Sequence, residues 1–408
     1  MKDPSPALTS SGDDFLHRLD AARRGGAAKV TGLKLEVFHP LQTETVGRAV
    51  RAGMWFSGGG HTVVGTGERT TLEVASGEAG TTIRQLVADG APGVLFTAGF
   101  DPQTPTTLIV PDGLVVDAGA LPVEPPGVPY EATALEVTIS ESARAWSASV
   151  AEAAAAIAEA TNPLRKVVLA RELRVRADTV IDPQTVMFGL AGTFPTAYLY
   201  SIGSLVGASP ELLGQVFDGR FAARALAGTI GRDGDPRRDA DVARVLLHSA
   251  KDRHEHQLLQ SFLAERLAAW VEDLSFPLEP ELLTLTNVHH LMTVFAGRMG
   301  SAGSGPGGLV DLIAAIHPTP AIAGVPQADA LDWIRAHEPP RGRLGGFAGW
   351  TDRDGNGQAV LVIRSLELDG RTARLVVGNG IVGDSNPADE VRENQAKARG
   401  ILDAVTSL

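Results

Sequence analysis

The sequence contains no cysteine among its 408 residues. This absence excludes disulfide bonds, thiolate metal ligands and a cysteine nucleophile, and it fits a reducing cytoplasm, where we expect the protein to be located. No apolar run reaches the roughly 18 residues that a membrane-spanning helix needs. We also expect the polar, acidic start of the chain to be neither a signal peptide nor a membrane anchor.

Basic residues are outnumbered by acidic ones, 36 Lys and Arg against 48 Asp and Glu, so the net charge is −12. Neither nucleic acid nor a membrane is therefore expected as a partner, because both require a basic surface. An anion that binds to this protein must be met by a local positive site. Hydrophobic residues make up 44% and charged residues 21% of the chain, which is typical of a globular protein with a substantial core.

The apolar pattern predicts strands and helices in mixed order. From about residue 30 to 125, short β-rich runs alternate with Gly and Pro turns, and one helix interrupts them at 81–90. After an Ala-rich helix at 143–161, the strands follow one another in hairpins rather than in strand–helix–strand units. We therefore predict an α+β fold, a single large domain of antiparallel β-sheets packed together with helices on the outside.

The most informative stretch is Lys251–His256, which is polar or charged throughout and includes the carboxylates of Asp252 and Glu255. It lies between two runs, 239–250 and 257–274, whose apolar residues have helical spacing. We predict both runs to be helices. Alone, such a stretch is typical of a solvated helix face.

A second carboxylate-rich helix is predicted at 387–405. Within it, Glu390, Glu393 and Lys397 are spaced by three and four residues and therefore share one face. Two acidic helices, one of which also carries a lysine, could supply oxygen ligands to a hard divalent cation and a positive charge beside it.

Two other patterns invite functions that the surrounding sequence argues against. Gly378–Gly383 has the glycine spacing of a dinucleotide-binding loop, but no helix follows it immediately. These glycines instead indicate close approach of the backbone to a ligand. The pairs His254/His256 and His289/His290 lack the spacing of four that places two imidazoles on one helix face, so structural hydrogen bonds are favoured over zinc binding.

Nine short motifs follow one another through the last part of the chain. They lie at 166–171, 208–213, 226–229, 249–256, 287–291, 317–326, 362–365, 378–382 and 390–397. In this order and at these spacings they resemble the chorismate-utilising enzymes, and most of all the isochorismate synthases. The resemblance is specific from about residue 160 to the end, and the N-terminal third matches loosely.

The composition of the chain and this resemblance together predict a division of the chain. Residues 1–12 are expected to be a flexible N-terminus, and residues 13–125 the N-terminal part of the sheet scaffold. Residues 126–408 are the chorismate-binding catalytic portion, which we expect to form one structural domain with the preceding part. The Pro-rich stretch at 121–131 is the candidate linker.

The resemblance also implies a reaction, in which water adds at ring carbon 2 of chorismate and the hydroxyl at carbon 4 leaves. This chemistry needs a base on one side of the substrate and an acid on the other. By motif match, Lys166 is the base, with a pKa lowered by desolvation, and Glu211 is the acid, with a raised pKa. Without the family match, Lys166 would be an ordinary lysine at the edge of a strand.

Chorismate is a dianion, and the resemblance supplies the positive site that it requires. Mg²⁺ held by Glu255 and Glu393, with Glu390 acting through water, would bind the ring carboxylate. Arg364, otherwise an ordinary strand arginine, would receive the other carboxylate together with Lys397. The remaining substrate contacts implied by the motifs are Gly228, Thr229, His290, Ala321, Ile322, Gly378 and Gly380.

Within the family, the outcome depends on a few positions. Lys166 favours water as the nucleophile. Ala321 lies where salicylate-forming relatives usually carry Thr, so the reaction is expected to stop at isochorismate, for a siderophore, menaquinone or salicylate pathway. The alternatives are a salicylate synthase-type lyase of the same family and a chorismate-binding protein without turnover.

Three positions depart from the family pattern. Relatives typically carry Tyr at Leu344, Glu at Gln358 and Ala at Asn379, so substrate affinity is in question. No glutamine amidotransferase segment is expected. The predicted partner is the small molecule chorismate, the predicted cofactor is Mg²⁺, and the protein is expected to act as a monomer.

Overall fold

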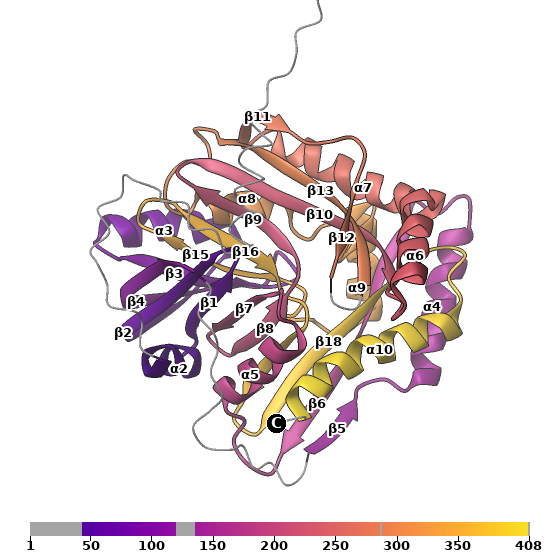
Figure 1. The fold of residues 1–408 in the computed structure, drawn as a ribbon, viewed down its shortest axis with the longest axis horizontal. Coiled ribbons are helices and arrows are strands. Elements are labelled where there is room, and N and C mark those ends of the chain that lie inside the picture. Colours follow the sequence, from indigo (N-terminus) through magenta and orange to yellow (C-terminus); the bar gives the residue numbers. More distant parts are fainter. Residues whose placement is uncertain (1–42, 120–134, 286–287, 407–408) are drawn as a thin grey trace, which may run out of the picture.

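The computed structural model describes residues 43–119, 135–285 and 288–406. The expected flexible start at 1–12 and the candidate linker at 121–131 lie outside these described residues. Figure 1 shows strands through the middle of the molecule and helices on the outside. All the pairings between described strands are antiparallel, so the predicted α+β class is confirmed.

The first half of the described chain supplies mostly strands and hairpins. It contains α2 (Thr43–Arg51), β1 (Met54–Gly58), β2 (His61–Val74), α3 (Ala79–Ala88), β3 (Gly93–Ala98), β4 (Thr106–Ala118), β5 (Leu135–Ile139), α4 (Ala143–Ala158), β6 (Lys166–Ala177), α5 (Pro183–Thr193), β7 (Tyr198–Ile202), β8 (Leu205–Ser209), β9 (Leu212–Phe217) and β10 (Arg220–Gly231).

The second half contains the two carboxylate-rich helices. Its elements are α6 (Pro236–His248), α7 (Ala250–Leu267), β11 (Val271–Ser275), β12 (Glu281–Thr284), β13 (Val288–Met299), α8 (Gly308–Ile316), β14 (Gly324–Val325), α9 (Gln327–His337), β15 (Phe347–Asp352), β16 (Gly357–Leu361), β17 (Ser365–Asp369), β18 (Thr372–Ile381) and α10 (Pro387–Thr406).

Strand pairing is continuous from one end of the sheet to the other. The order is β5–β6–β18–β17–β8–β7–β1–β2–β4–β3–β15–β16–β9–β10–β13, with β14 added to β6 and with β11 and β12 added to β13. The N-terminal strands therefore stand in the middle of this order. They join the β6–β18 region to the β10–β13 region, and these two regions carry most of the motifs.

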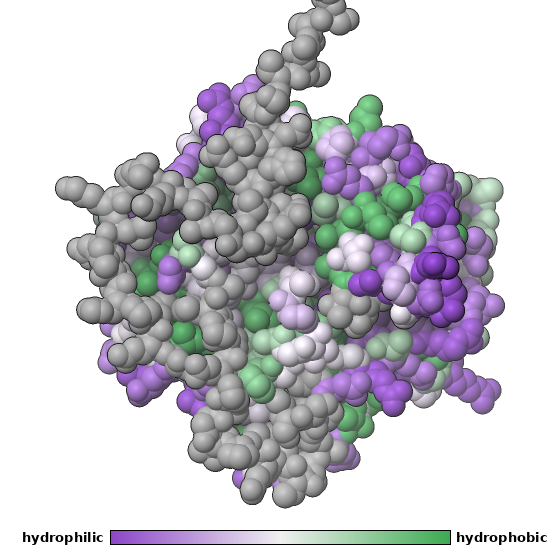
Figure 2. Space-filling model, in the orientation of Figure 1, coloured by the Kyte–Doolittle hydropathy of each residue, from purple (hydrophilic) through white to green (hydrophobic). Residues whose placement is uncertain are grey.

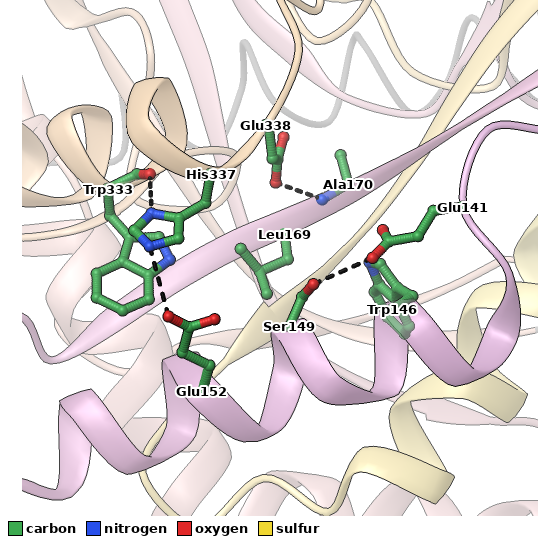
Figure 3. Close-up of a pocket in the computed structure, with 9 residues that line it drawn as sticks. All are labelled: Glu141, Trp146, Ser149, Glu152, Leu169, Ala170, Trp333, His337 and Glu338. Carbon is green, nitrogen blue, oxygen red and sulfur yellow. Dashed lines mark hydrogen bonds and ion pairs between the residues drawn. The ribbon is translucent and has the colours of Figure 1, made fainter.

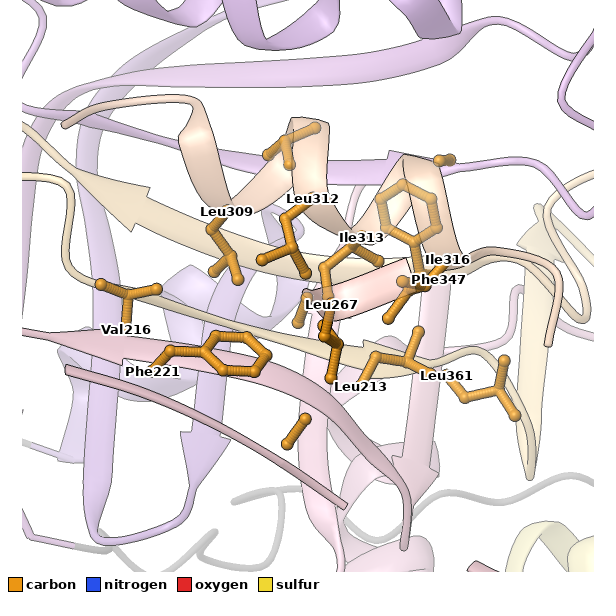
Figure 4. Close-up of a cluster of buried hydrophobic side chains, with 14 of the residues drawn as sticks. Leu213, Val216, Phe221, Leu267, Leu309, Leu312, Ile313, Ile316, Phe347 and Leu361 are labelled. Atoms are coloured by element: carbon orange, nitrogen blue, oxygen red, sulfur yellow. The ribbon is translucent and has the colours of Figure 1, made fainter. Parts of the chain in front are cut away.

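The helices cover the sheet with their apolar faces. Leu267 at the end of α7 and Leu312 and Ile313 of α8 pack with Phe221 and Phe347 in the cluster shown in Figure 4. A second cluster joins α5 and α10 to β6 and β18. Burial of these side chains is the main favourable contribution to folding, since each one stabilises the fold by about 1.5–3 kcal/mol.

Both predicted helices are present, but the second begins at Ala250, so Lys251–His256 forms the start of α7 and does not lie between two helices. The Ser249 hydroxyl accepts a hydrogen bond from the Asp252 N–H at 3.2 Å and caps α7 directly after α6 ends. The predicted helix 257–274 ends at Leu267, and residues 271–275 form β11. Val271 pairs with Met299 of β13, so strand pairing overrides the helical pattern there.

None of the described helices is long and apolar enough to cross a membrane. On the face shown in Figure 2, hydrophilic residues gather over α6, at the right-hand edge. The hydrophobic residues that α6 and α7 contribute to the core, such as Leu246 and Leu259, are buried beneath them.

Candidate active site

Lys166 is the first residue of β6, and its side chain lies against a glycine of the neighbouring strand. β6 pairs with β18 so that Val167 lies opposite Ile381 and Val168 opposite Gly380. A Cβ added at Gly380 would stand 2.8 Å from Lys166 Cε. Gly380 therefore leaves room for the lysine, which explains one glycine of the 378–383 stretch by packing.

The Lys166 ammonium forms an ion pair with Glu255 of α7, with 2.5 Å between Nζ and Oε1. Lys166 is 7% exposed. Burial alone would raise the pKa of the Glu255 carboxyl, but Lys166, with Lys251 and Lys397, outweighs burial and lowers the pKa below its ordinary value. The candidate base and a candidate metal ligand are thus direct partners, although 89 positions separate them in sequence.

Glu211 lies between β8 and β9 and is buried. Its backbone is fixed on both sides, because its N–H donates to the Ser209 hydroxyl at 3.2 Å and its carbonyl accepts from Leu361 N–H at 3.1 Å. Burial raises the pKa of the Glu211 carboxyl to about 7, although the nearby cations Lys166 and Arg364 oppose the shift. At neutral pH a large fraction of this carboxyl carries a proton, as a general acid requires.

Arg364 is held in an unusual backbone conformation between β16 and β17. Its φ of +52° falls in the left-handed region, which non-glycine residues rarely occupy. Its guanidinium carbon stands 4.9 Å from the centre of the Phe194 ring. Burial lowers the pKa of Arg364, whereas the charge of Glu211 raises it, which places the guanidinium within electrostatic reach of the candidate acid. Such strain is typical of functional sites.

The strands β10 and β13 bring Thr229 and His290 together. A bulge at Gly228, whose φ is +76°, shifts the register so that Thr229 lies opposite His290, and Thr229 Oγ1 is 2.8 Å from His290 Nδ1. Burial is the main cause that lowers the pKa of His290 to about 4, and the charges of Arg364 and Lys397 lower it further. The imidazole is therefore neutral at neutral pH and available for hydrogen bonding.

The candidate ligands on α10 have different partners. Lys397 Nζ lies 2.7 Å from Glu393 Oε1 and donates to the carbonyl of Gly378 at 3.1 Å. Glu390 instead accepts hydrogen bonds from the Asn379 amide at 2.9 Å and from the Ser385 hydroxyl at 3.0 Å. The predicted shared face is present, but Glu390 has neutral donors where Glu393 has a cation.

The segment 317–326 returns to β6 beside Lys166. Ala323 O accepts from Val168 N–H at 2.8 Å, and Val325 pairs with Lys166. Within this segment, Ala321 and Ile322 are partly buried against the main core cluster. Their expected contact with the substrate stays a prediction.

Five side chains form one group, which we call the charged cluster: Lys166, Glu211, Glu255, Arg364 and Lys397. Their contacts and electrostatic effects connect β6, α7 and α10 with the β8–β9 and β16–β17 connections. His290 lies within reach of two of the cations. The cluster combines a cation beside a carboxylate, a protonated carboxyl group and further cations, and such a group can bind a dianion and move protons on it.

A hard cation at this site would need oxygen ligands from carboxylates. Among the described residues, no group of three His, Asp or Glu side chains is arranged to hold a metal ion. Lys397 links the two candidate ligands: its charge helps to lower the pKa of Glu255, and its ammonium forms an ion pair with Glu393. Two carboxylates fit Mg²⁺, which commonly takes one or two and completes its shell with water and substrate.

A small hollow lies elsewhere, between α4, α9 and β6 (Figure 3). Its lining includes none of the candidate site residues, and its polar groups bond to one another. Ser149 donates to Glu141 at 3.1 Å, His337 is 3.8 Å from Glu152, and Glu338 accepts from the Ala170 N–H at 2.8 Å. These contacts hold the helices against β6.

Comparison with known proteins decides the family. A family model described as chorismate binding enzyme matches residues 125–406. The chain belongs to the chorismate-binding enzymes. This membership confirms the family predicted from the nine motifs.

Several individual proteins that resemble this chorismate-binding enzyme are named as isochorismate synthases. The putative isochorismate synthase MenF of Mycobacterium tuberculosis is 37% identical over 328 residues, which cover 77% of this chain and 87% of the relative. The isochorismate synthase EntC of Escherichia coli is 37% identical over 256 residues, which cover 61% of this chain and 64% of the relative. The solved structure of a putative 2,3-dihydroxybenzoate-specific isochorismate synthase, DhbC from Bacillus anthracis, matches with a TM-score of 0.78 at 28% identity, covering 89% of this chain and 99% of the other.

The three departures from the family pattern lie in different surroundings in this chorismate-binding enzyme. Leu344 is buried in a core cluster with Trp350. Gln358 is fully buried, where its amide donates to Gln215 at 3.2 Å and accepts from the Trp350 indole at 3.4 Å. Both are therefore accommodated by packing. Asn379 alone touches a candidate ligand.

Several partners of the site residues were not predicted. Phe194 lies under Arg364, and Ser385 and Asn379 bind Glu390. Phe194 has no sequence signal, because it is 170 positions from its partner and lies at the end of an apolar helix. Ser385 likewise gave no signal, because it lies two residues before α10 begins at Pro387.

Proposed function

We propose that this chorismate-binding enzyme is a Mg²⁺-dependent isochorismate synthase. The observation that carries the proposal is the pair Lys166 and Glu211, a buried cation and a buried carboxyl with a pKa near 7, within electrostatic reach of each other. The names of the relatives support it, since the enzymes from M. tuberculosis and E. coli are both called isochorismate synthases.

Proton transfer follows from the two groups. To act as the base, Lys166 would first pass its ammonium proton to solvent; it would then accept a proton from the water whose oxygen bonds to ring carbon 2, while the ring double bond shifts towards carbon 4. The carbon 4 hydroxyl leaves as water when it receives the proton of Glu211. One water enters and one leaves, so chorismate and isochorismate are isomers, and the two residues return to their starting states by exchanging a proton through solvent.

The anionic groups of the substrate need cations. Arg364 and Lys397 would bind one carboxylate, with the backbone near Gly378 and Gly380 alongside. Glu255 and Glu393 would hold Mg²⁺, with Glu390 acting through water, and the ion would supply positive charge for the ring carboxylate. Thr229 and His290 would contact the ring.

The test is to incubate the purified chain with chorismate, with Mg²⁺ or with a chelator, and to identify the products by chromatography and mass. We expect isochorismate only when Mg²⁺ is present. Salicylate with pyruvate would replace the proposal with a lyase of the same family. Chorismate binding without any product would show a binding protein, and turnover in the chelator would remove the metal from the proposal.

A further inference from the structure

The side chain of Tyr200 crosses a glycine to reach the strand that begins directly after Arg364. β7, β8 and β17 are neighbours in the sheet, with Tyr200 opposite Gly207 and Gly207 opposite Ser365. A Cβ added at Gly207 would stand 2.6 Å from the Tyr200 hydroxyl oxygen and would also clash with Ser365 Oγ. Gly207 therefore leaves the space in which the two hydroxyl groups meet.

These two hydroxyl groups form a directed chain of hydrogen bonds. Tyr200 Oη and Ser365 Oγ are 2.6 Å apart, and Ser365 Oγ is 2.7 Å from the Ile363 carbonyl oxygen. A carbonyl oxygen only accepts, so Ser365 donates its one proton to Ile363 and Tyr200 donates to Ser365. Tyr200 is 0% and Ser365 2% exposed, so bulk water does not compete for these bonds.

The chain of hydrogen bonds encloses Arg364. Ile363 and Ser365 are the two sequence neighbours of this arginine, and the bond between them closes a short ring around its backbone. The Arg364 carbonyl in turn accepts from the Ala208 N–H at 3.1 Å. A φ of +52° is unfavourable for a residue with a Cβ, so this conformation persists only where its surroundings hold it.

We propose that Tyr200 is a positioning residue, which through Ser365 holds Arg364 where its guanidinium binds a carboxylate of the substrate. The inference rests on the proposed function, because it concerns the carboxylate that Arg364 would bind there. Without the tyrosine hydroxyl, Ser365 loses the donor that fixes it, and the arginine backbone is free to leave the left-handed conformation. Since the substrate carboxylate does not change in the reaction, the loss falls on binding and not on the chemical step.

The test compares two tyrosines of the same strand in the full-length chain. Tyr200→Phe deletes one hydroxyl. Tyr198→Phe is the matched control, because Tyr198 lies in the same core cluster and its ring also packs near Phe56, but its hydroxyl lies beside Gly59. With chorismate and Mg²⁺, we expect Tyr200→Phe to raise KM about fivefold and to keep kcat within about twofold of wild type. Tyr198→Phe should leave KM unchanged. A merely structural defect would reduce the amount of active enzyme, and thus kcat, without moving KM.

Ser365→Ala provides the second variant. It removes the bond to Ile363 as well, so KM should rise at least as far as in Tyr200→Phe. Adding Tyr200→Phe to Ser365→Ala should raise KM no further, because the tyrosine acts through the serine. An unchanged KM in both single variants, an equal rise in Tyr198→Phe, or additive effects in the double variant overturns the inference.

Calorimetry with chorismate separates this inference from the proposed function. Wild-type turnover with an unchanged KM in Tyr200→Phe and Ser365→Ala refutes the inference alone. Wild-type protein that binds chorismate without turnover refutes the synthase, and weaker binding in the same two variants still supports the role of Tyr200. Wild-type protein that binds no chorismate refutes both.

Discussion

Two buried glutamates, Glu211 and Glu338, show how one residue type takes two roles near β6. Glu338, at the end of α9, accepts hydrogen bonds from Arg341 at 2.8 Å and from the Ala170 N–H at 2.8 Å. No described residue donates a hydrogen bond to the Glu211 carboxyl, whose nearby cations act over a longer range. The side chain of Glu338 is 8% exposed, and Glu211 as a whole residue is 8% exposed. The two glutamates are therefore similarly buried, but only the Glu338 carboxylate has hydrogen-bond donors among the described residues.

Burial raises the pKa of both carboxyl groups above its ordinary value. At Glu338 the fixed donors satisfy the carboxylate, which suits a structural contact. At Glu211 the proton remains available to a substrate. A buried carboxyl with fixed partners stabilises the fold, whereas one without them is suited to proton transfer.

The largest expected effect is the loss of turnover when Lys166, the candidate base near Glu211, is replaced. Lys166→Ala removes the base, and general base catalysis contributes on the order of 10²–10⁴-fold, so turnover of chorismate should fall by about 10³-fold. Chorismate binding should remain detectable by calorimetry, because Arg364 and Lys397 are kept. Normal turnover in this variant would remove Lys166 from the mechanism.

The next largest effect is expected at Glu338, on the free energy of unfolding. Glu338→Gln keeps the volume of the side chain but removes the charge that Arg341 faces, and Arg341 also donates to the Val168 carbonyl at 2.6 Å and the Ile322 carbonyl at 3.2 Å. Breaking a buried ion pair from one side costs about 3–5 kcal/mol. Urea unfolding should show a loss of about 3 kcal/mol. A loss below about 1 kcal/mol would show that Glu338 is not the structural partner of Arg341.

Glu211→Gln should change how the free energy of unfolding depends on pH. The folded chain holds the Glu211 proton up to about pH 7, whereas the ordinary carboxyl value is 4.5, so folding takes up a proton in this window. The free energy of unfolding therefore falls as the pH rises from about 4.5 to 7, by up to about 3 kcal/mol. In Glu211→Gln this fall should disappear. Urea unfolding at pH 5 and pH 8 measures the difference, and an equal fall in both proteins would contradict a raised pKa.

Sequence alone predicted the fold class and many of its elements. The apolar run 106–118 is β4, and the helix expected at 387–405 is α10. The family was predicted because nine local motifs occur in one order. Local periodicity failed at Val271–Ser275, where helical spacing predicted a helix but pairing with β13 makes the strand β11.

Contacts within the site depended on tertiary structure. The order of the motifs showed which residues matter, but it did not show that Lys166 bonds Glu255 or that Glu390 bonds Asn379. Such pairs join strands and helices far apart in the chain, and spacing along one element carries no information about them. The one relationship on α10 that spacing did predict, Glu393 with Lys397, is an i, i+4 pair.

The smallest expected effect concerns the space that Gly380 leaves for Lys166. A Cβ at this position would stand 2.8 Å from Lys166 Cε and 3.4 Å from Nζ, so Gly380→Ala should push the lysine from its place. Misplacing a catalytic group by a fraction of an ångström lowers kcat by about tenfold. The free energy of unfolding should change by less than about 1 kcal/mol, because the displaced atoms are the end of a flexible side chain.

The matched control is Gly383→Ala, in the same glycine stretch, whose added Cβ would meet Ala158 of α4 at 3.3 Å and no residue of the charged cluster. Steady-state kinetics of the two variants separates the lysine from a general effect on the strand. A tenfold loss in Gly380→Ala alone supports the position of Lys166, because only that substitution reaches its side chain. Equal kcat in both variants would show that the lysine works from another position and that the glycine is needed for the backbone alone.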